Sequence, residues 1–351
     1  MAKPWVIDSD THVDETEGTW NYVDDEAFRP TLGRYENHPD GRANYWLIGG
    51  NKVRRANRDD SITRTTVATR ELLDVGARLR HMDELGVEVQ VIYPTIFIRC
   101  TATEPEVELN VTRSYNRWLA DRTGQAGGRL RWVFVPSPLN MDETVADLRW
   151  ARDHGACGIL KKGDTEASHA PYDPFFFPLY EEAERLDLPI CVHTGSGRPD
   201  FGDDRMPPFP PVGGVAVFTG IYQLIRTGVP ARFPKLRFGA IEAGASWLPL
   251  VEHSLRRGQE REHLFHVERS EETSFEANHV YVTCQVSEDF TTILRYISED
   301  NLLVGSDYSH HDISNEMGFI PTLQALANEG VIPGTVPRKI LYDNAKAFYG
   351  L

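Results

Sequence analysis

The chain of 351 residues is long enough for one large core, and its 40% apolar and 25% charged residues are ordinary for a folded soluble protein. The formal net charge of −15 argues against non-specific binding to nucleic acid or to an anionic membrane. Four scattered cysteines, with no Cys-x-x-Cys pair, argue against a disulfide framework or a zinc ribbon. No apolar leader opens the chain and no apolar run is long enough for a membrane span, so we expect a soluble cytoplasmic protein.

The first predicted element is a strand within residues 6–15. Alternation along this strand places Asp8, Asp10 and His12 on one face, and Glu15 lies just beyond its end. Such a strand end is typical of a metal site, although a surface turn rich in Asp and Thr would look similar. We expect Asp8 to be a deeper structural acid and Asp14 to face solvent.

A polar stretch over residues 16–65 follows, and it is too long for an ordinary connection. We interpret it as a lid or binding insertion with some structure of its own. The basic residues within 52–58 would suit a phosphate-bearing substrate, or would form a solvated face that balances nearby acids.

Helical patterns then alternate with short apolar runs. Helices are predicted near 66–86, 106–124, 141–154, 175–187, 212–228, 246–266, 289–299 and 335–349, and further strands at 87–95, 130–136, 155–161, 189–194, 236–242, 279–284 and 301–307. Eight near-continuous apolar strands separated by helices indicate an α/β fold, a (β/α)8 TIM barrel with an insertion after its first strand. No Gly-x-Gly-x-x-Gly motif follows that strand, which argues against a Rossmann fold. We expect a single domain over residues 1–351.

The candidate ligands fall at the C-terminal ends of the predicted strands, where barrels of this kind place their active sites. They are Asp10 and His12 on the first strand, His193 on the fifth, Glu242 on the sixth and Asp307 on the eighth. A buried carboxylate at such a place needs a cation. Adjacent side chains point apart, so we expect one ligand from the pair that follows the eighth strand, His310 and His311, and take His310 as the candidate.

Other chemical candidates are weaker. Lys161 and Lys162 end the fourth strand and would be solvated or anion-binding lysines, with a carbamylated bridging lysine as the alternative. Isolated histidines such as His81 and His154 have no partner pattern. The two Glu-x-x-His pairs at 260–263 and 276–279 lie in a charged stretch and at a strand start, the wrong end of a barrel for catalysis.

These strand ends, together with the runs Glu-Ala-Gly-Ala-Ser-Trp-Leu-Pro over 242–249 and Gly-Ser-Asp-Tyr-Ser-His-His over 305–311, resemble the amidohydrolase-2 group of metal-dependent TIM barrels, which contains hydrolases and aromatic-acid decarboxylases. His12, His193 and Asp307 match that group's metal-ligand positions. Asp10 stands where the group usually has His or Glu, and Glu242 where a catalytic His is common. Four carboxylates and three imidazoles are too many for one zinc or manganese ion, so two metal ions are expected, from the set Asp10, His12, Glu15, His193, Glu242, Asp307 and His310.

This pattern, with Val-Ile-Tyr-Pro-Thr over 91–95 and Tyr-Asn-Arg-Trp over 115–118, is similar to the TIM-barrel non-haem di-iron monooxygenases typified by the diterpenoid hydroxylase of platensimycin and platencin biosynthesis. The resemblance implies an oxidoreductase of antibiotic biosynthesis with two Fe ions, in which Glu242 and Asp307 are catalytic. It would hydroxylate a C–H bond of a diterpenoid or other CoA-linked small molecule, using O₂ and an external electron donor.

Tyr93, Asn116 and Trp247 would shape the pocket of such an enzyme, and Arg54 and Arg55 would bind the CoA phosphates. The alternative keeps the fold and changes the chemistry, to a metal-dependent hydrolase or non-oxidative decarboxylase that uses Zn or Mn. Glu242 would then be a general base. Neither nucleic acid nor a membrane is expected as a partner, and the acidic surface is compatible with a monomer or a homodimer.

Overall fold

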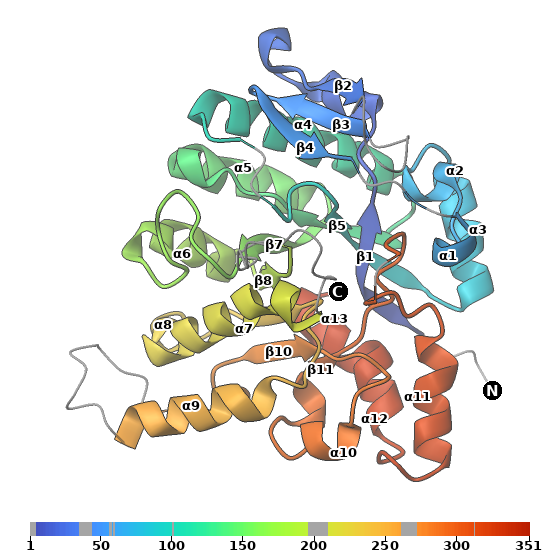
Figure 1. The fold of residues 1–351 in the computed structure, drawn as a ribbon, viewed down its shortest axis with the longest axis vertical. Coiled ribbons are helices and arrows are strands. Elements are labelled where there is room, and N and C mark those ends of the chain that lie inside the picture. Colours follow the sequence, from blue (N-terminus) through green and yellow to red (C-terminus); the bar gives the residue numbers. More distant parts are fainter. Residues whose placement is uncertain are drawn as a thin grey trace.

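A computed structural model describes residues 5–34, 44–55, 58, 60–99, 102–195, 210–260, 272–311 and 313–351 of the protein. Eight strands form one sheet: β1 (Ile7–Val13), β5 (Val89–Pro94), β6 (Leu130–Phe134), β7 (Ala156–Lys162), β8 (Ile190–His193), β9 (Phe238–Ile241), β10 (Val280–Thr283) and β11 (Leu302–Leu303). The longer helices lie around the outside of this sheet (Figure 1): α3 (Val75–Leu85), α4 (Pro105–Gly124), α5 (Met141–Asp153), α6 (Phe177–Arg185), α7 (Pro210–Arg226), α9 (Leu248–Glu260) and α11 (Phe319–Asn328).

The sheet is parallel throughout and follows the chain in the order β1-β5-β6-β7-β8-β9-β10-β11. Backbone hydrogen bonds then join the last strand to the first. The Ser9 amide donates to the Val304 carbonyl (3.1 Å), and the Asp307 amide donates to the Asp10 carbonyl (3.0 Å). The predicted eight-stranded TIM barrel is therefore confirmed, and its closure brings the first and eighth strand ends together.

Each predicted strand is present because its apolar run is buried. All seven residues of β1 and the first six of β7 are buried, as expected for a strand covered by helices on one side and filling the barrel on the other. The shorter helices are α1 (Asp60–Thr63), α2 (Val67–Arg70), α8 (Val229–Arg232), α10 (Phe290–Ile293), α12 (Val336–Arg338), a π-helix η7 (Lys339–Asp343) and α13 (Asn344–Tyr349). Among the described residues, no helix combines the length and apolar character needed to cross a membrane.

Several predicted helices differ in detail. The pattern over 66–86 divides into α2 and α3, because Leu72 adopts a left-handed backbone (φ 49°) and the Asp74 side chain caps a new helix by accepting from the Ala77 amide. Helix α11 was not predicted. Pro321 lies in its first turn, where a missing amide hydrogen costs nothing, so the proline does not break the helix. The end of the helix predicted over 246–266 falls outside the described residues.

The insertion after β1 has structure of its own, as predicted. It holds the 3-10 helix η1 (Glu17–Tyr22) and an antiparallel sheet of β2 (Thr31–Arg34), β3 (Asn44–Ile48) and β4 (Asn51–Arg54). Gly49 and Gly50, both with positive φ, make the tight turn between β3 and β4. The buried Trp46 packs edge-on against Trp20 of η1, with ring centroids 5.5 Å apart, and thereby joins this sheet to the 3-10 helix. Residues 35–43, 56–57 and 59 of the insertion lie outside the described ranges.

Candidate metal centre

The first strand presents two acids and one imidazole, at every second position, to the barrel interior. Asp8, Asp10 and His12 are all buried. Asp8 accepts hydrogen bonds from the Ser306 amide (2.8 Å) and hydroxyl (2.6 Å), and from Gln90 (3.3 Å). Burial raises its pKa to about 6, against the opposing effect of these hydrogen bonds. Asp8 therefore links the first and last strands as a structural acid, in agreement with the sequence interpretation.

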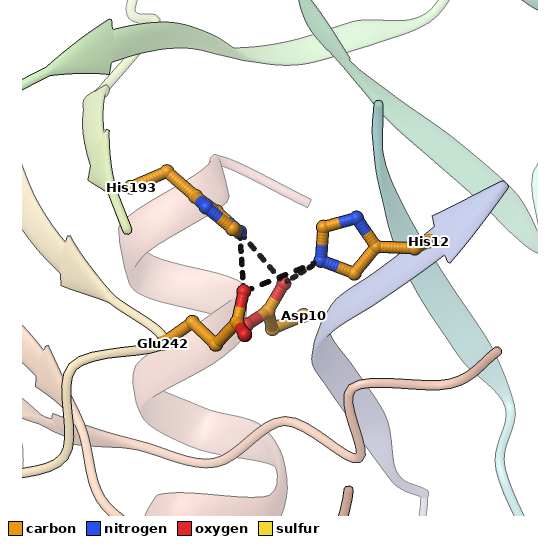
Figure 2. A group of neighbouring side chains, drawn as sticks. All are labelled: Asp10, His12, His193 and Glu242. Atoms are coloured by element: carbon orange, nitrogen blue, oxygen red, sulfur yellow. Dashed lines mark ion pairs between the residues drawn. The ribbon is translucent and has the colours of Figure 1, made fainter. Parts of the chain in front are cut away.

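Four side chains from three segments of the chain, the first strand and the ends of β8 and β9, converge on one another (Figure 2). His12 Nε2 lies 3.5 Å from Asp10 Oδ1 and 3.6 Å from Glu242 Oε2. His193 Nε2 lies 3.5 Å from Asp10 Oδ1 and 3.3 Å from Glu242 Oε2. One donor atom from each of the four residues falls within 4.8 Å of all the others.

These distances fit a shared cation better than direct hydrogen bonds. Hydrogen bonds between charged groups are about 2.7–2.9 Å long, whereas donors about 2.1 Å from one tetrahedral ion are about 3.4 Å from each other. Four of the facing atoms are buried and have no hydrogen-bond partner: Asp10 Oδ1, His12 Nε2, His193 Nε2 and Glu242 Oε2. Unpartnered polar atoms are costly in a protein interior, so this group is built as a metal-binding site.

The backbone fixes the orientation of both imidazoles. His12 Nδ1 lies 2.9 Å from the Pro94 carbonyl oxygen, and His193 Nδ1 lies 2.9 Å from the Thr194 carbonyl oxygen. Each Nδ1 must carry a hydrogen to donate to its carbonyl, which leaves Nε2 as the nitrogen that faces the other ligands.

Without a metal, the group is a strongly coupled set of charges. Burial alone would raise the pKa of Asp10 and lower that of His12. The contacts between them outweigh burial: His12 and His193 hold the pKa of Asp10 well below its usual range, and Asp10 and Glu242 hold that of His12 well above its own.

Asp307 and His310 extend the site on the other side of His12. Asp307 Oδ1 lies 3.4 Å from His12 Nε2 and 2.8 Å from His310 Nδ1. The His310 ring stacks on the His12 ring at 3.7 Å, and its Nε2 lies 3.2 Å from the Thr95 hydroxyl. Burial lowers the pKa of His310 well below its usual value. His310 is buried beside Asp307 and His12, whereas His311 is exposed, and the assignment of His310 as the ligand of the pair stays a prediction.

Two of the acids occupy strained backbone positions. Glu242 (φ 53°) and Asp307 (φ 50°) are left-handed although neither is glycine. Such a conformation costs on the order of 1–3 kcal/mol and persists where the surroundings impose it. For Glu242 the amide donates to the Thr283 hydroxyl (2.8 Å). These left-handed positions direct the carboxylates of Glu242, just after β9, and Asp307, beyond β11, into the barrel mouth.

Ser314 is a site residue that sequence reasoning missed. Its hydroxyl lies 2.9 Å from Glu242 Oε1 and 2.8 Å from Asp307 Oδ2. It belongs to an irregular loop seven residues after Asp307, and no motif or periodicity in the sequence marks it.

The structure places Glu15 apart from the four-residue group. Glu15 Oε1 accepts hydrogen bonds from the Thr95 amide (3.0 Å) and the Ile96 amide (3.2 Å), and burial raises its pKa to about 7. Asp14 was expected to face solvent, and this is wrong. It is buried because Arg58 (2.9 Å) and Arg70 (3.5 Å) pair with it.

The residues predicted to contact substrate have other partners in the structure. Tyr93 is buried beneath the site, and its hydroxyl lies 2.8 Å from that of Tyr349. Asn116 makes two hydrogen bonds to the backbone of Val135. Trp247 donates its indole N–H to the Gly244 carbonyl (2.7 Å).

The two arginines differ from each other. Arg54 is exposed on β4, whereas Arg55 pairs with Glu71 at 2.6 Å. At the end of β7, Lys161 was expected to be a solvated or anion-binding lysine, with a carbamylated bridging lysine as the alternative. It is buried instead, forms an ion pair with Glu166, and lies 4.2 Å from the centroid of the Phe176 ring.

The comparisons with known proteins agree with this fold. A family model described as amidohydrolase matches residues 7–351. No protein of curated function matches the chain significantly. Among solved structures, an amidohydrolase from Mycobacterium avium subsp. paratuberculosis K-10 is 19% identical, with both chains covered in full and a TM-score of 0.77.

Two decarboxylase structures are also similar. 5-Carboxyvanillate decarboxylase from Novosphingobium aromaticivorans, complexed with manganese and 4-hydroxy-3-methoxy-5-nitrobenzoic acid, is 18% identical, with 81% of this chain and 82% of that chain covered and a TM-score of 0.65. 2,6-Dihydroxybenzoate decarboxylase, complexed with 2,6-dihydroxybenzoate, is 17% identical, with 78% and 87% covered and a TM-score of 0.58. At such identities these likenesses show the fold.

These comparisons overturn the monooxygenase expectation. The similar structures are amidohydrolases and decarboxylases rather than oxidoreductases, so the predicted C–H hydroxylation and role in antibiotic biosynthesis are wrong, and the hydrolase or lyase alternative is favoured. The error has a physical reason. A mixed set of carboxylates and imidazoles suits iron and manganese alike, so the residue types could not separate the two chemistries.

Proposed function

Because the chain belongs to the amidohydrolase family, we propose that it is a metal-dependent, non-oxidative decarboxylase of an aromatic acid. The observation that carries the proposal is the buried group of donor atoms on Asp10, His12, His193 and Glu242, which lack hydrogen-bond partners and have the mutual distances of ligands to one ion. The similar decarboxylase structures that hold hydroxylated benzoates support this substrate class.

These four residues would hold the first divalent ion, for which manganese is a suitable choice with oxygen and imidazole donors. When bound, the ion would supply a positive charge that orients the substrate's carboxylate and adjacent hydroxyl oxygens. A second ion would have fewer ligands. His12 also faces Asp307, but its single unprotonated nitrogen can bind only one ion, which leaves Glu242, Asp307 and His310 for the second. We therefore propose one tight site and one weak site, the first of which is sufficient for activity.

Decarboxylation replaces the bond between the ring carbon and the carboxyl carbon with a C–H bond, so a proton has to reach that ring carbon as CO₂ leaves. We propose that Asp307 delivers it. Its Oδ1 lies 2.8 Å from His310 Nδ1, and its Oδ2 lies 2.8 Å from the Ser314 hydroxyl, so both oxygens have polar neighbours that could resupply a proton.

Arg58 is the residue of the insertion that we propose contacts substrate. Its guanidinium is almost fully buried at the edge of the site, 2.9 Å from Asp14 Oδ1 and 3.4 Å from the Thr95 hydroxyl, which in turn contacts His310. Arginine is well suited to bind a planar carboxylate. We therefore propose that residues 16–65 act as a lid of a single catalytic domain. A CoA-linked substrate, a homodimer and a cytoplasmic location stay predictions.

The test is the release of CO₂ from a panel of ortho-hydroxybenzoic acids by protein that has been stripped of metal and reloaded with Mn²⁺. We expect release that depends on the metal and does not depend on O₂. The variant His193→Ala should release CO₂ at least about a hundredfold more slowly, because it removes one of the four proposed metal ligands.

Hydrolysis is the second candidate, favoured by Glu242, whose carboxylate could act as a general base. Ester or lactone cleavage without CO₂ release from any acid would support it and refute the decarboxylase proposal.

A further inference from the structure

The loop after β11 contacts two acids that belong to different strands. Ser314 Oγ lies within hydrogen-bond distance of Glu242 Oε1 and Asp307 Oδ2, the first at the end of β9 and the second just beyond β11. A hydroxyl carries one hydrogen and can donate to only one carboxylate at a time. Ser314 therefore couples the two carboxylates to each other instead of serving either one alone.

Each of these carboxylates uses its two oxygens for different tasks. The oxygens that face Ser314 are turned away from the imidazoles, whereas the other oxygens face them. Glu242 Oε2 lies 3.3 Å from His193 Nε2, and Asp307 Oδ1 lies 3.4 Å from His12 Nε2. The terminal torsion of a carboxylate is soft, so a fixed contact at one oxygen decides where the other oxygen points.

The loop that carries Ser314 is itself held in place. The Asn315 side-chain amide donates to the His310 carbonyl (2.9 Å). The Glu316 amide donates to the Ser306 carbonyl (3.0 Å), and Glu316 Oε2 accepts from the Val286 amide (2.7 Å). The hydroxyl is thus fixed relative to β10 and β11 before any ligand binds, which is what a positioning group requires.

From this arrangement we propose that Ser314 is a positioning residue that sets the rotation of the Glu242 and Asp307 carboxylates toward the metal. This inference rests on the proposed metal site. Removing the hydroxyl takes this contact away from Glu242 Oε1 and Asp307 Oδ2, so the cost falls on metal affinity and geometry and not on the stability of the barrel. Groups that orient metal ligands typically contribute about 10- to 100-fold in affinity.

The experiment compares Ser314→Ala with Ser314→Thr, which restores a hydroxyl, and with Ser287→Ala. Ser287 is a matched control because it is an exposed serine whose hydroxyl contacts Glu316 (3.2 Å) and no proposed ligand. Mn²⁺ affinity is measured on metal-stripped protein by competition with a chelator, and the electron paramagnetic resonance spectrum of bound Mn²⁺ reports its ligand geometry. Melting temperatures without metal check that each variant folds.

We expect S314A to bind Mn²⁺ about 10- to 100-fold more weakly with a changed spectrum. S314T should recover most of the affinity, and S287A should match the wild type. If S314A matches the wild type in both affinity and spectrum, Ser314 has no positioning role although the metal site stands. If the wild type binds no divalent ion, the metal site itself fails and this inference with it.

Discussion

The variant Glu15→Gln distinguishes two roles of this residue. The sequence predicts that Glu15 is a metal ligand, whereas the structure places it as a buried acid bonded to backbone amides. The structure places Glu15 in a buried position where one oxygen accepts from the Thr95 and Ile96 amides. A glutamine keeps an oxygen to accept these two hydrogen bonds and removes the charge. The sequence instead suggests that Glu15 is a metal ligand, in which case the same variant would lose metal.

The magnitude follows from the pKa of Glu15, which burial raises from 4.5 to about 7. Between these two values the unfolded chain has lost its proton while the folded chain keeps it. The folded state therefore binds more protons there, and the free energy of unfolding falls as pH rises from 4.5 through 7. The folded and unfolded pKa values of Glu15 differ by about 2.5 units, which lowers the free energy of unfolding by about 3 kcal/mol above pH 7.

The assay is urea unfolding of metal-stripped wild type and E15Q at pH 4.5 and pH 8. E15Q should have nearly wild-type stability at pH 4.5 and should exceed the wild type by up to about 3 kcal/mol at pH 8. Its Mn²⁺ affinity should be unchanged. Equal stability of the two proteins at both pH values, or a loss of Mn²⁺ binding, would refute this interpretation of Glu15.

Three further outcomes follow from packing, hydrogen bonding and charge. Asn116→Ala leaves the buried amide and carbonyl of Val135 without their partner, so the free energy of unfolding in urea should fall by about 1–3 kcal/mol. A change within experimental error would contradict a stabilising role for these two hydrogen bonds. Gly305→Ala would place a Cβ 2.3 Å from that of Asp10 and should lower both melting temperature and Mn²⁺ affinity, whereas Gly318→Ala, with nothing within 4 Å, should change neither. Arg58→Gln should raise the KM of the acid substrate more than it lowers kcat, and a kcat effect alone would exclude a binding role.

Most of the fold could be predicted because each strand is a short apolar run between amphipathic helices. Asp10, His12, His193, Glu242 and Asp307 were found for the same reason, since a residue at the C-terminal end of a barrel strand lies in the mouth by topology. Side chains beyond a strand end could not be placed in this way. Their direction depends on the loop backbone, which turned Glu15 toward the Thr95 amide and brought Ser314 between two acids.

The chemistry was harder to predict than the position. The same carboxylates and imidazoles can hold iron for oxidation or manganese for decarboxylation, and neither periodicity nor spacing separates the two. The residues that contact substrate were also hard to predict, because a polar side chain can serve the fold instead. Asn116 and Trp247 donate hydrogen bonds to the backbone carbonyls of Val135 and Gly244.

The most direct test of the metal centre is the position of the ion in a crystal of the Mn²⁺-loaded protein, measured by anomalous diffraction. We predict one strong peak within about 2.0–2.3 Å of Asp10 Oδ1, His12 Nε2, His193 Nε2 and Glu242 Oε2. A second, weaker peak near Asp307 and His310 would match the proposed weak site. No peak among the four donor atoms, or a strong peak only elsewhere, would contradict the account.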